Sequence, residues 1–285
     1  MTTTRIIAAA LATITATQVA AQDASFEFSG SIGSLTNQHG GNDIEDNGGI
    51  DGTDTRASAT LGLSVAYGLV NGWTGVTALS LGGFSDPDEA LSTGDTTRST
   101  ADLTVRVLSD QGAYTLGGFA GFGTHNDNGD SDEIMTYGYV GAEIAGATSF
   151  GGYYAQIGYL DSADEYDEGT QEAPFINLGG SYNITADYTL TGSLGFAAGQ
   201  KYEDDYDNRI MNAAIGVERA IGDLLVSVGY EATQISYLYT DDTRYGDTFG
   251  SFSIGATYAF GGSADHGSPL PSFGNWVAFN ANEVE

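Results

Sequence analysis

The sequence predicts an all-β protein, an antiparallel transmembrane β-barrel of about 12 strands. Three observations predict this fold: apolar side chains recur at every second residue, short and long connections alternate, and acidic residues gather in the long connections. The 285 residues include 38 acids but only 8 Lys and Arg, so the formal net charge is −30. The absence of cysteine excludes disulfides and thiolate metal sites, and the scattered basic residues exclude a nucleic-acid binder.

The N-terminal residues have the pattern of a secretory signal peptide. Arg5 supplies the positive charge, residues 6–16 form an apolar run without acids, and Val19–Ala21 are small residues before a cleavage point. The apolar run is shorter than the ~20 residues that a membrane-spanning helix needs. We therefore expect export, with a signal peptide at 1–21, the barrel at 22–260 and a C-terminal tail at 261–285.

Alternation with a period of two residues defines the expected strands. Within 57–69 the odd positions are apolar and the even positions are small or polar, so a strand there has two different faces. Most segments cover about 10–13 residues, which is enough for a tilted strand to cross a bilayer. The segments at 73–84 and 134–145 alternate poorly. The expected strands cover 24–34, 56–68, 73–84, 98–108, 112–123, 134–145, 149–160, 174–184, 187–198, 209–220, 223–239 and 248–260.

The connections favour the same arrangement. Most of the 38 acids lie in the long connections, and short periplasmic turns with longer acidic external loops are typical of outer-membrane barrels. Aromatic residues at strand ends, such as Tyr67 with Trp73 and Tyr182 with Tyr188, predict a girdle at the membrane interface. The expected short turns are 69–72, 109–111, 146–148, 185–186 and 221–222, and the expected long loops are 35–55, 85–97, 124–133, 161–173, 199–208 and 240–247.

A soluble β-sandwich is the alternative fold, because its strands also alternate. Its outward face should be rich in charged side chains, whereas the non-apolar face here is Gly, Ser and Thr. The chain also has a single lysine, Lys201. This composition favours the membrane barrel.

The chain resembles a Gram-negative outer-membrane β-barrel of the alphaproteobacterial porin type. Residues Phe26–Gly33 are similar to the first strand of such porins, and Gly255–Phe260 resembles a barrel-assembly signal with its terminal aromatic. The resemblance implies an outer-membrane location, contact with outer-membrane lipid and lipopolysaccharide, and the barrel-assembly machinery as a partner. General porins have about 16 strands and a long third loop, and both features are missing from the expected pattern.

The tail is a second departure from the porin pattern, because residues 261–285 follow the last expected strand. It contains Trp276, Val277 and Phe279. We expect a periplasmic extension, a plug in the lumen or an extra strand, and the sequence does not choose between them.

The inward positions predict what the barrel does. They are mostly Gly, Ser, Thr and Ala, which leave room for water along the axis. Among the charged inward positions acids outnumber arginine, and acid-lined pores favour cations. We expect a passive, cation-preferring channel for small hydrophilic solutes, with Asp102 and Arg106 as a pair across a constriction and the oligomeric state left open. The expected pore-lining residues are Glu27, Asp102, Arg106, Glu143, Glu218 and Glu231.

A closed barrel is the alternative function. The carboxylates would then pair with Arg106 and brace a filled lumen, and the chain would be a structural or adhesin-type barrel. Its acidic loops would bind divalent cations or lipopolysaccharide. The most calcium-like cluster is Asp127, Asp130, Asp132 and Glu133, but its spacing is not that of an EF-hand, and a solvated acidic surface explains it equally. No other cofactor is expected.

An enzyme is not expected. The three histidines are His39 and His125, in expected loops, and His266 in the tail. No serine has a histidine on an adjacent expected strand, so a serine nucleophile would lack its base. The G-x-S-x-G elbow is absent, and Gly192–Gly195 only approximates it.

Overall fold

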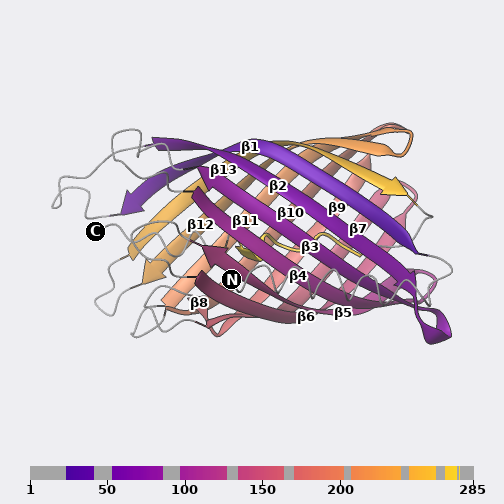
Figure 1. Ribbon diagram of the computed structural model, residues 1–285, viewed down its shortest axis with the longest axis horizontal. Helices are drawn as coiled ribbons and strands as arrows, with labels where there is room; N and C mark the ends of the chain where they lie inside the picture. Colours follow the sequence, from indigo (N-terminus) through magenta and orange to yellow (C-terminus); the bar gives the residue numbers. More distant parts are fainter. Residues whose placement is uncertain are drawn as a thin grey trace.

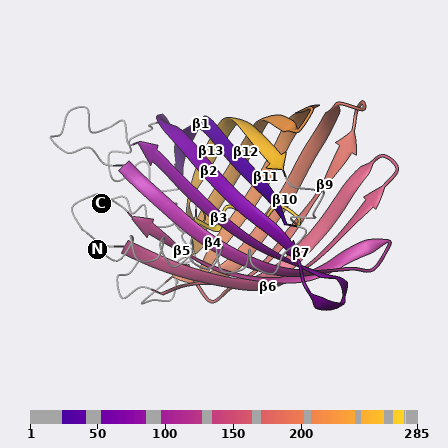
Figure 2. The same ribbon diagram turned by 45° about the vertical axis from the view of Figure 1, so that its right-hand side comes forward.

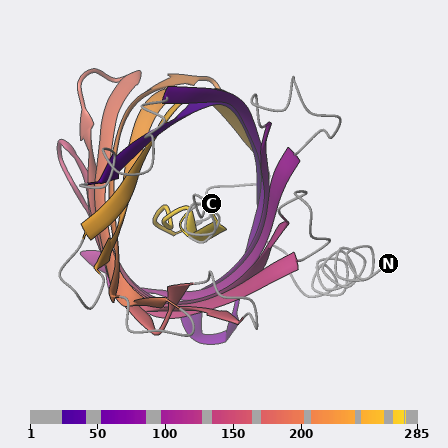
Figure 3. The ribbon, with the colours of Figure 1, turned by 90° about the vertical axis from the view of Figure 1, so that its left-hand side faces the viewer.

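The strands form one closed ring in the computed structural model (Figure 1). Neighbours in sequence pair antiparallel, and the last strand pairs with the first, from Phe26 opposite Phe260 to Gly41 opposite Tyr245. Figures 2 and 3 show the tilted strands from the side and the ring along its axis. The structure describes residues 24–41, 53–85, 97–126, 134–163, 170–201, 207–238, 244–260, 267–274 and 276.

Twelve long strands build this ring in the described residues, which confirms the predicted antiparallel barrel. The two-residue β8 pairs with β10 beside it. A single 3-10 turn, η1 (Val70–Gly72), joins β2 and β3. The strands are β1 (Ser25–Gly41), β2 (Thr53–Gly68), β3 (Trp73–Ser85), β4 (Thr97–Asp110), β5 (Tyr114–Asn126), β6 (Ile134–Thr148), β7 (Gly151–Ala163), β8 (Thr170–Gln171), β9 (Ala173–Asn183), β10 (Tyr188–Lys201), β11 (Asp207–Ile221), β12 (Leu224–Leu238) and β13 (Arg244–Phe260).

Several strands run further than expected on the side of the long loops. β1 continues to Gly41 and β13 begins at Arg244, beyond the expected limits of 34 and 248. Side-chain alternation marks only the part of a strand with two different environments, whereas backbone pairing continues where both faces are polar. For this reason His125, expected in a loop, belongs to β5, where its side chain is fully buried.

The outer wall is an apolar band. Alternate residues point outward, and Ile32, Leu61 and Leu194 expose 69%, 58% and 64% of their surface. Arg209 and Arg219 also lie on the outward face, near the two ends of β11. A tilted strand rises by roughly 25 Å between them, which is the height of the apolar band of a membrane barrel. This spacing fits a bilayer around the barrel.

Aromatic residues surround the outer wall at the short-turn end. The expected girdle residues Trp73, Tyr182 and Tyr188 are all exposed there. The guanidinium of Arg219 lies 5.3 Å from the centre of the Tyr188 ring, so the cation has a partner where the apolar band ends. Amphipathic rings at this level are typical of the membrane interface.

Glycines make room for the aromatic residues of the inner wall. A Cβ atom added to any of several glycines would collide with an aromatic ring from the neighbouring strand. Glycines of the described strands therefore serve side-chain packing as well as turns. The inner pairs of ring and glycine are Phe119 with Gly141, Tyr139 with Gly121, Tyr137 with Gly123, Tyr154 with Gly179, and Phe175 with Gly158.

Several expectations fall outside the described residues. They are the signal peptide at 1–21, the central parts of the long acidic loops, and the calcium-like cluster of Asp127, Asp130, Asp132 and Glu133. Among the residues that the structure describes, no helix has the length and apolar content that a membrane-spanning helix needs.

A charge on the outer wall tests the bilayer assignment. Leu194→Arg places a guanidinium near the middle of β10 on the outward face, and we expect it to lower the free energy of unfolding by ~2–4 kcal/mol. Urea unfolding of the refolded protein in lipid vesicles measures this change. The matched control is Ser193→Arg, the adjacent residue, which lines the inner cavity and should have little effect. Equal losses for the two variants would contradict the assignment.

Candidate functional site

The C-terminal segment lies inside the barrel. Figure 3 shows it in yellow, within the ring of strands. β13 ends at the short-turn side, and the described part of the tail runs from Gly267, beside Arg106 at mid-height, to Trp276 nearer the long loops. The tail forms a short helical turn in which the Trp276 amide donates to the Ser272 carbonyl at 3.0 Å. The sequence allowed a periplasmic extension, a plug in the lumen or an extra strand. In the structure, residues 267–274 and 276 lie in the lumen.

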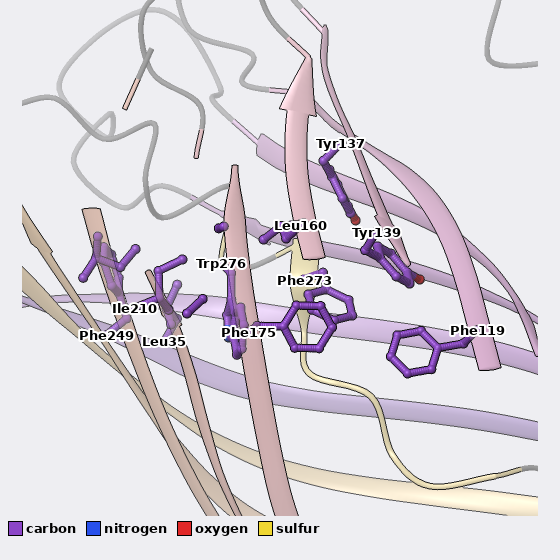
Figure 4. Packing of buried hydrophobic residues seen from close by; sticks show 13 residues of the cluster. Leu35, Phe119, Tyr137, Tyr139, Leu160, Phe175, Ile210, Phe249, Phe273 and Trp276 are labelled. Carbon is purple, nitrogen blue, oxygen red and sulfur yellow. The ribbon is translucent and has the colours of Figure 1, made fainter. Parts of the chain in front are cut away.

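An apolar cluster surrounds the end of this segment (Figure 4). Phe273 and Trp276 of the tail are 2% and 0% exposed. Wall residues from strands around most of the ring meet them there, so the loop-side half of the lumen is filled by side chains. The wall members of the cluster are Leu35, Phe119, Tyr137, Tyr139, Leu160, Ala173, Phe175, Ala197, Ile210, Ile235 and Phe249.

A buried chain of polar side chains crosses the inner wall below this cluster. Arg106 Nη1 of β4 donates to both carboxylate oxygens of Glu143 of β6, at 3.1 and 3.3 Å. Gln156 Nε2 of β7 donates to Glu143 at 3.2 Å, and Gln156 Oε1 accepts from Asn177 Nδ2 of β9 at 2.8 Å. Gln156 Nε2 also reaches the Ser268 carbonyl of the tail at 3.5 Å. We call these residues, Arg106, Glu143, Gln156 and Asn177, the polar rail.

A glycine on β5 lets the rail cross that strand. Gly117 pairs with Glu143, and a Cβ atom at Gly117 would lie 3.2 Å from Glu143 Cγ. Glu143 therefore reaches over β5 to Arg106. This contact replaces the expected pair of Asp102 and Arg106, which was wrong because the two residues lie on one strand, roughly 13 Å apart along it.

Asp102 instead belongs to a separate cluster of hydroxyls. Its carboxylate accepts hydrogen bonds from Tyr139 at 2.6 Å, Tyr137 at 3.0 Å and Thr104 at 3.1 Å. The Thr104 and Tyr139 hydroxyls also contact each other at 2.5 Å. Three donors hold this carboxylate in place, so it fixes the positions of the two tyrosine rings.

The turn-side half of the lumen holds a cavity of about 730 Å³. Small residues of β6, β7 and β9–β13 line it, together with Gly267, Ser268 and Pro269 of the tail. Glu218 and Glu231 are its charged lining residues in the described chain. Water can enter such a space, because much of its lining is glycine and serine.

The structure places all six charged residues singled out in the sequence on the inner face. Arg106 and Glu143 are joined in the rail, and Asp102 lies in its hydroxyl cluster. Glu218 and Glu231 line the cavity, and Glu231 accepts from Asn212 Nδ2 at 2.7 Å. Glu27 accepts from Ser64 at 3.5 Å near the turn side. Their role in a pore stays a prediction.

Sequence reasoning missed the aromatic part of the site. Tyr137 and Tyr139 lie on β6, in the segment 134–145 that alternates poorly. The alternation fails there because the inner face carries large rings as well as the outer face. That failure was the available signal for a filled lumen. In the described chain, no group of three or more His, Asp or Glu residues is placed to hold a metal ion.

No protein-family model matches the chain, and a search of curated proteins found no match. The crystal structure of the COG4313 outer membrane channel from Pseudomonas putida F1 is similar with a TM-score of 0.61 and 16% identity, over 84% of this chain and 96% of that chain. The beta domain of the Bordetella autotransporter Brka has a TM-score of 0.50 and 14% identity, over 84% and 100%. These likenesses show the outer-membrane β-barrel fold and do not support the alphaproteobacterial porin type in particular.

Removing a charge from the rail tests its structural role. Glu143→Gln keeps the shape of the side chain but removes the carboxylate that faces buried Arg106 at 3.1 Å. We expect a loss of about 3 kcal/mol in the free energy of unfolding, because breaking a buried ion pair is costly. Urea unfolding in lipid vesicles measures it. The control is Glu27→Gln, a half-buried residue near the short turns, which should lower the free energy of unfolding much less. Equal losses for the two variants would show that the rail does not stabilise the barrel more than an ordinary inner-wall carboxylate does.

Proposed function

We propose that the chain is an outer-membrane channel for the passive diffusion of small hydrophilic solutes, with a preference for cations. The cavity inside the wall carries this proposal, because a barrel that only anchors loops has no need of an open, water-accessible half. The fold that the chain shares with a known outer-membrane channel agrees with it. The proposal contains no chemical step, so it needs no catalytic residue.

The charges of the cavity support the cation preference. Glu218 and Glu231 lie on neighbouring strands β11 and β12, and no Lys or Arg is among the described residues that line the cavity. Two carboxylates in a space walled by hydrocarbon and backbone raise the local concentration of cations. Arg106, the cation of the polar rail, already forms an ion pair with Glu143.

The tail supplies the constriction. The route from the cavity toward the long loops passes the segment that carries Phe273 and Trp276, both buried in the apolar cluster. Apolar constrictions in channels restrict flow by excluding water. The tail is held by non-covalent contacts, so its departure would join the cavity to the loop side.

A closed structural barrel is the second candidate. The polar rail favours it, because Arg106, Glu143, Gln156 and Asn177 brace four strands around a filled half-lumen. The binding of divalent cations or lipopolysaccharide by the acidic loops belongs to this candidate and depends on residues outside the described chain. Conductance separates the two candidates.

A disulfide between the tail and the wall tests the constriction. The chain has no cysteine, and a Cβ atom at Gly274 would lie 3.2 Å from the Cβ of Thr100, near the ~3.5–4.5 Å of disulfides. With Thr100→Cys and Gly274→Cys together, we expect reduction to raise the conductance in a planar bilayer roughly fivefold or more, because it frees an apolar constriction.

Each single cysteine variant is the matched control and should not respond to the reductant. Equal conductance of the oxidised and reduced double variant would show that the tail does not control flow. Silence of the wild-type chain and of the reduced variant would overturn the channel and favour the closed barrel.

Neutralising the cavity tests the ion preference. Glu218→Gln with Glu231→Gln keeps the hydrogen-bond acceptors and removes both charges. We expect the permeability ratio of K⁺ to Cl⁻, measured as a reversal potential in a salt gradient, to fall by roughly two- to threefold. Arg219→Gln, on the outer wall, should leave the ratio unchanged. An unchanged permeability ratio in the double Glu variant as well as in Arg219→Gln would show that Glu218 and Glu231 do not determine the selectivity.

A further inference from the structure

An aromatic slot in the inner wall receives the tail (Figure 4). We define the slot as Phe119, Tyr139 and Phe175, from β5, β6 and β9. The Phe273 ring centre lies 4.3 Å from that of Tyr139 and 4.9 Å from that of Phe175, the latter edge to face. The ring centre of Phe119 lies 6.4 Å from that of Tyr139 and 6.3 Å from that of Phe175. The slot therefore surrounds one six-membered ring with others at favourable distances.

The wall builds this slot independently of the tail. Each ring of the slot lies over a glycine of an adjacent strand, where a Cβ atom would collide with it. Tyr139 is also fixed by its hydrogen bond to Asp102. Strand-borne rings held in this way keep their geometry when the occupant changes, so the slot is a preformed receptor for an aromatic ring.

The described part of the tail is held mainly by the apolar contacts of Phe273 and Trp276. The Ser268 carbonyl accepts a long 3.5 Å bond from Gln156. The indole N–H of Trp276 is buried and has no hydrogen-bond partner in the described part of the chain. A buried donor without a partner weakens the docked state of the tail. A solute with a six-membered aromatic ring could therefore compete with Phe273 for the slot.

We propose that the slot is a binding site for a single-ring aromatic solute without an anionic group, which takes the place of Phe273 and displaces the tail. The proposal rests on the proposed function and names a class of solute that shifts the tail away from its docked position, and so raises the conductance above that of the solute-free channel. The carboxylate of Asp102, bonded to the slot residue Tyr139, disfavours an anion. Gly267, Ser268 and Pro269 of the tail line the cavity and precede Phe273 in the chain, so the occupant of the slot belongs to a segment that also borders the cavity.

Trp276 reports on the position of the tail. The chain has two tryptophans, and Trp73→Phe leaves Trp276 as the single one in the full chain. In lipid vesicles we expect added benzyl alcohol to raise the acrylamide quenching of Trp276 along a saturable curve. Cyclohexylmethanol, of similar size without a π-face, should have a midpoint roughly two- to tenfold higher. Benzoate should have no effect at the same concentrations.

Two matched variants locate the effect. Phe175→Leu removes one ring of the slot and should raise the benzyl alcohol midpoint roughly two- to tenfold. Phe196→Leu makes the same change on the outer face of β10, where the side chain is 41% exposed, and should not. The oxidised Thr100→Cys, Gly274→Cys variant should show no response, because its tail cannot leave.

The outcomes separate this inference from the channel itself. Equal midpoints for benzyl alcohol and cyclohexylmethanol, or a linear response shared by both phenylalanine variants, would overturn the aromatic site even if the protein conducts. A saturable, aromatic-selective response from a protein that never conducts would support the slot and overturn the channel. The wild-type comparison of the two alcohols decides the question even if Phe175→Leu fails to fold.

Discussion

The pairing of β1 with β13 is the constraint on which the rest of the structure depends. In hydrocarbon every backbone N–H and C=O needs a partner within the chain, and only closure of the sheet removes the two unpaired edges. Closure divides the side chains into an outer set that must be apolar and an inner set that is free to vary. The polar rail, the hydroxyl cluster and the cavity all use this freedom of the inner face.

The sequence predicted the wall well, because the bilayer imposes a period of two residues on each strand that crosses it. The same parity placed Glu27, Asp102, Arg106, Glu143, Glu218 and Glu231 on the inner face. It could not predict partners. Glu143 meets Arg106 across an intervening strand on which Gly117 leaves room for the side chain, and such a contact has no periodic signature.

The tail was beyond prediction for a different reason. Its position follows from tertiary contacts of Phe273 and Trp276 with rings that are distant in sequence, and neither alternation nor composition encodes these contacts. The poorly alternating segment 134–145 carried the indirect evidence, since an inner face with Tyr137 and Tyr139 needs something apolar to cover it.

The lumen therefore consists of two different halves. On the loop side, aromatic and aliphatic side chains fill the space between the walls. On the turn side, small residues leave the cavity with its two glutamates. The rail lies between them and touches the tail at Ser268, so the boundary of the two halves is also the place where the tail meets the buried hydrogen-bonded part of the wall.

The position of the tail after the last strand has a consequence for biogenesis. The tail contacts β4, β6, β7, β9 and β10, and residues of β1, β11, β12 and β13 complete the apolar cluster around its end. The tail itself is connected to β13, one of the two strands that form the seam. The apolar cluster includes residues of both seam strands, so its full set of wall contacts exists only in the closed ring. A sheet with a parted seam would leave the inner aromatic rings without that surrounding wall.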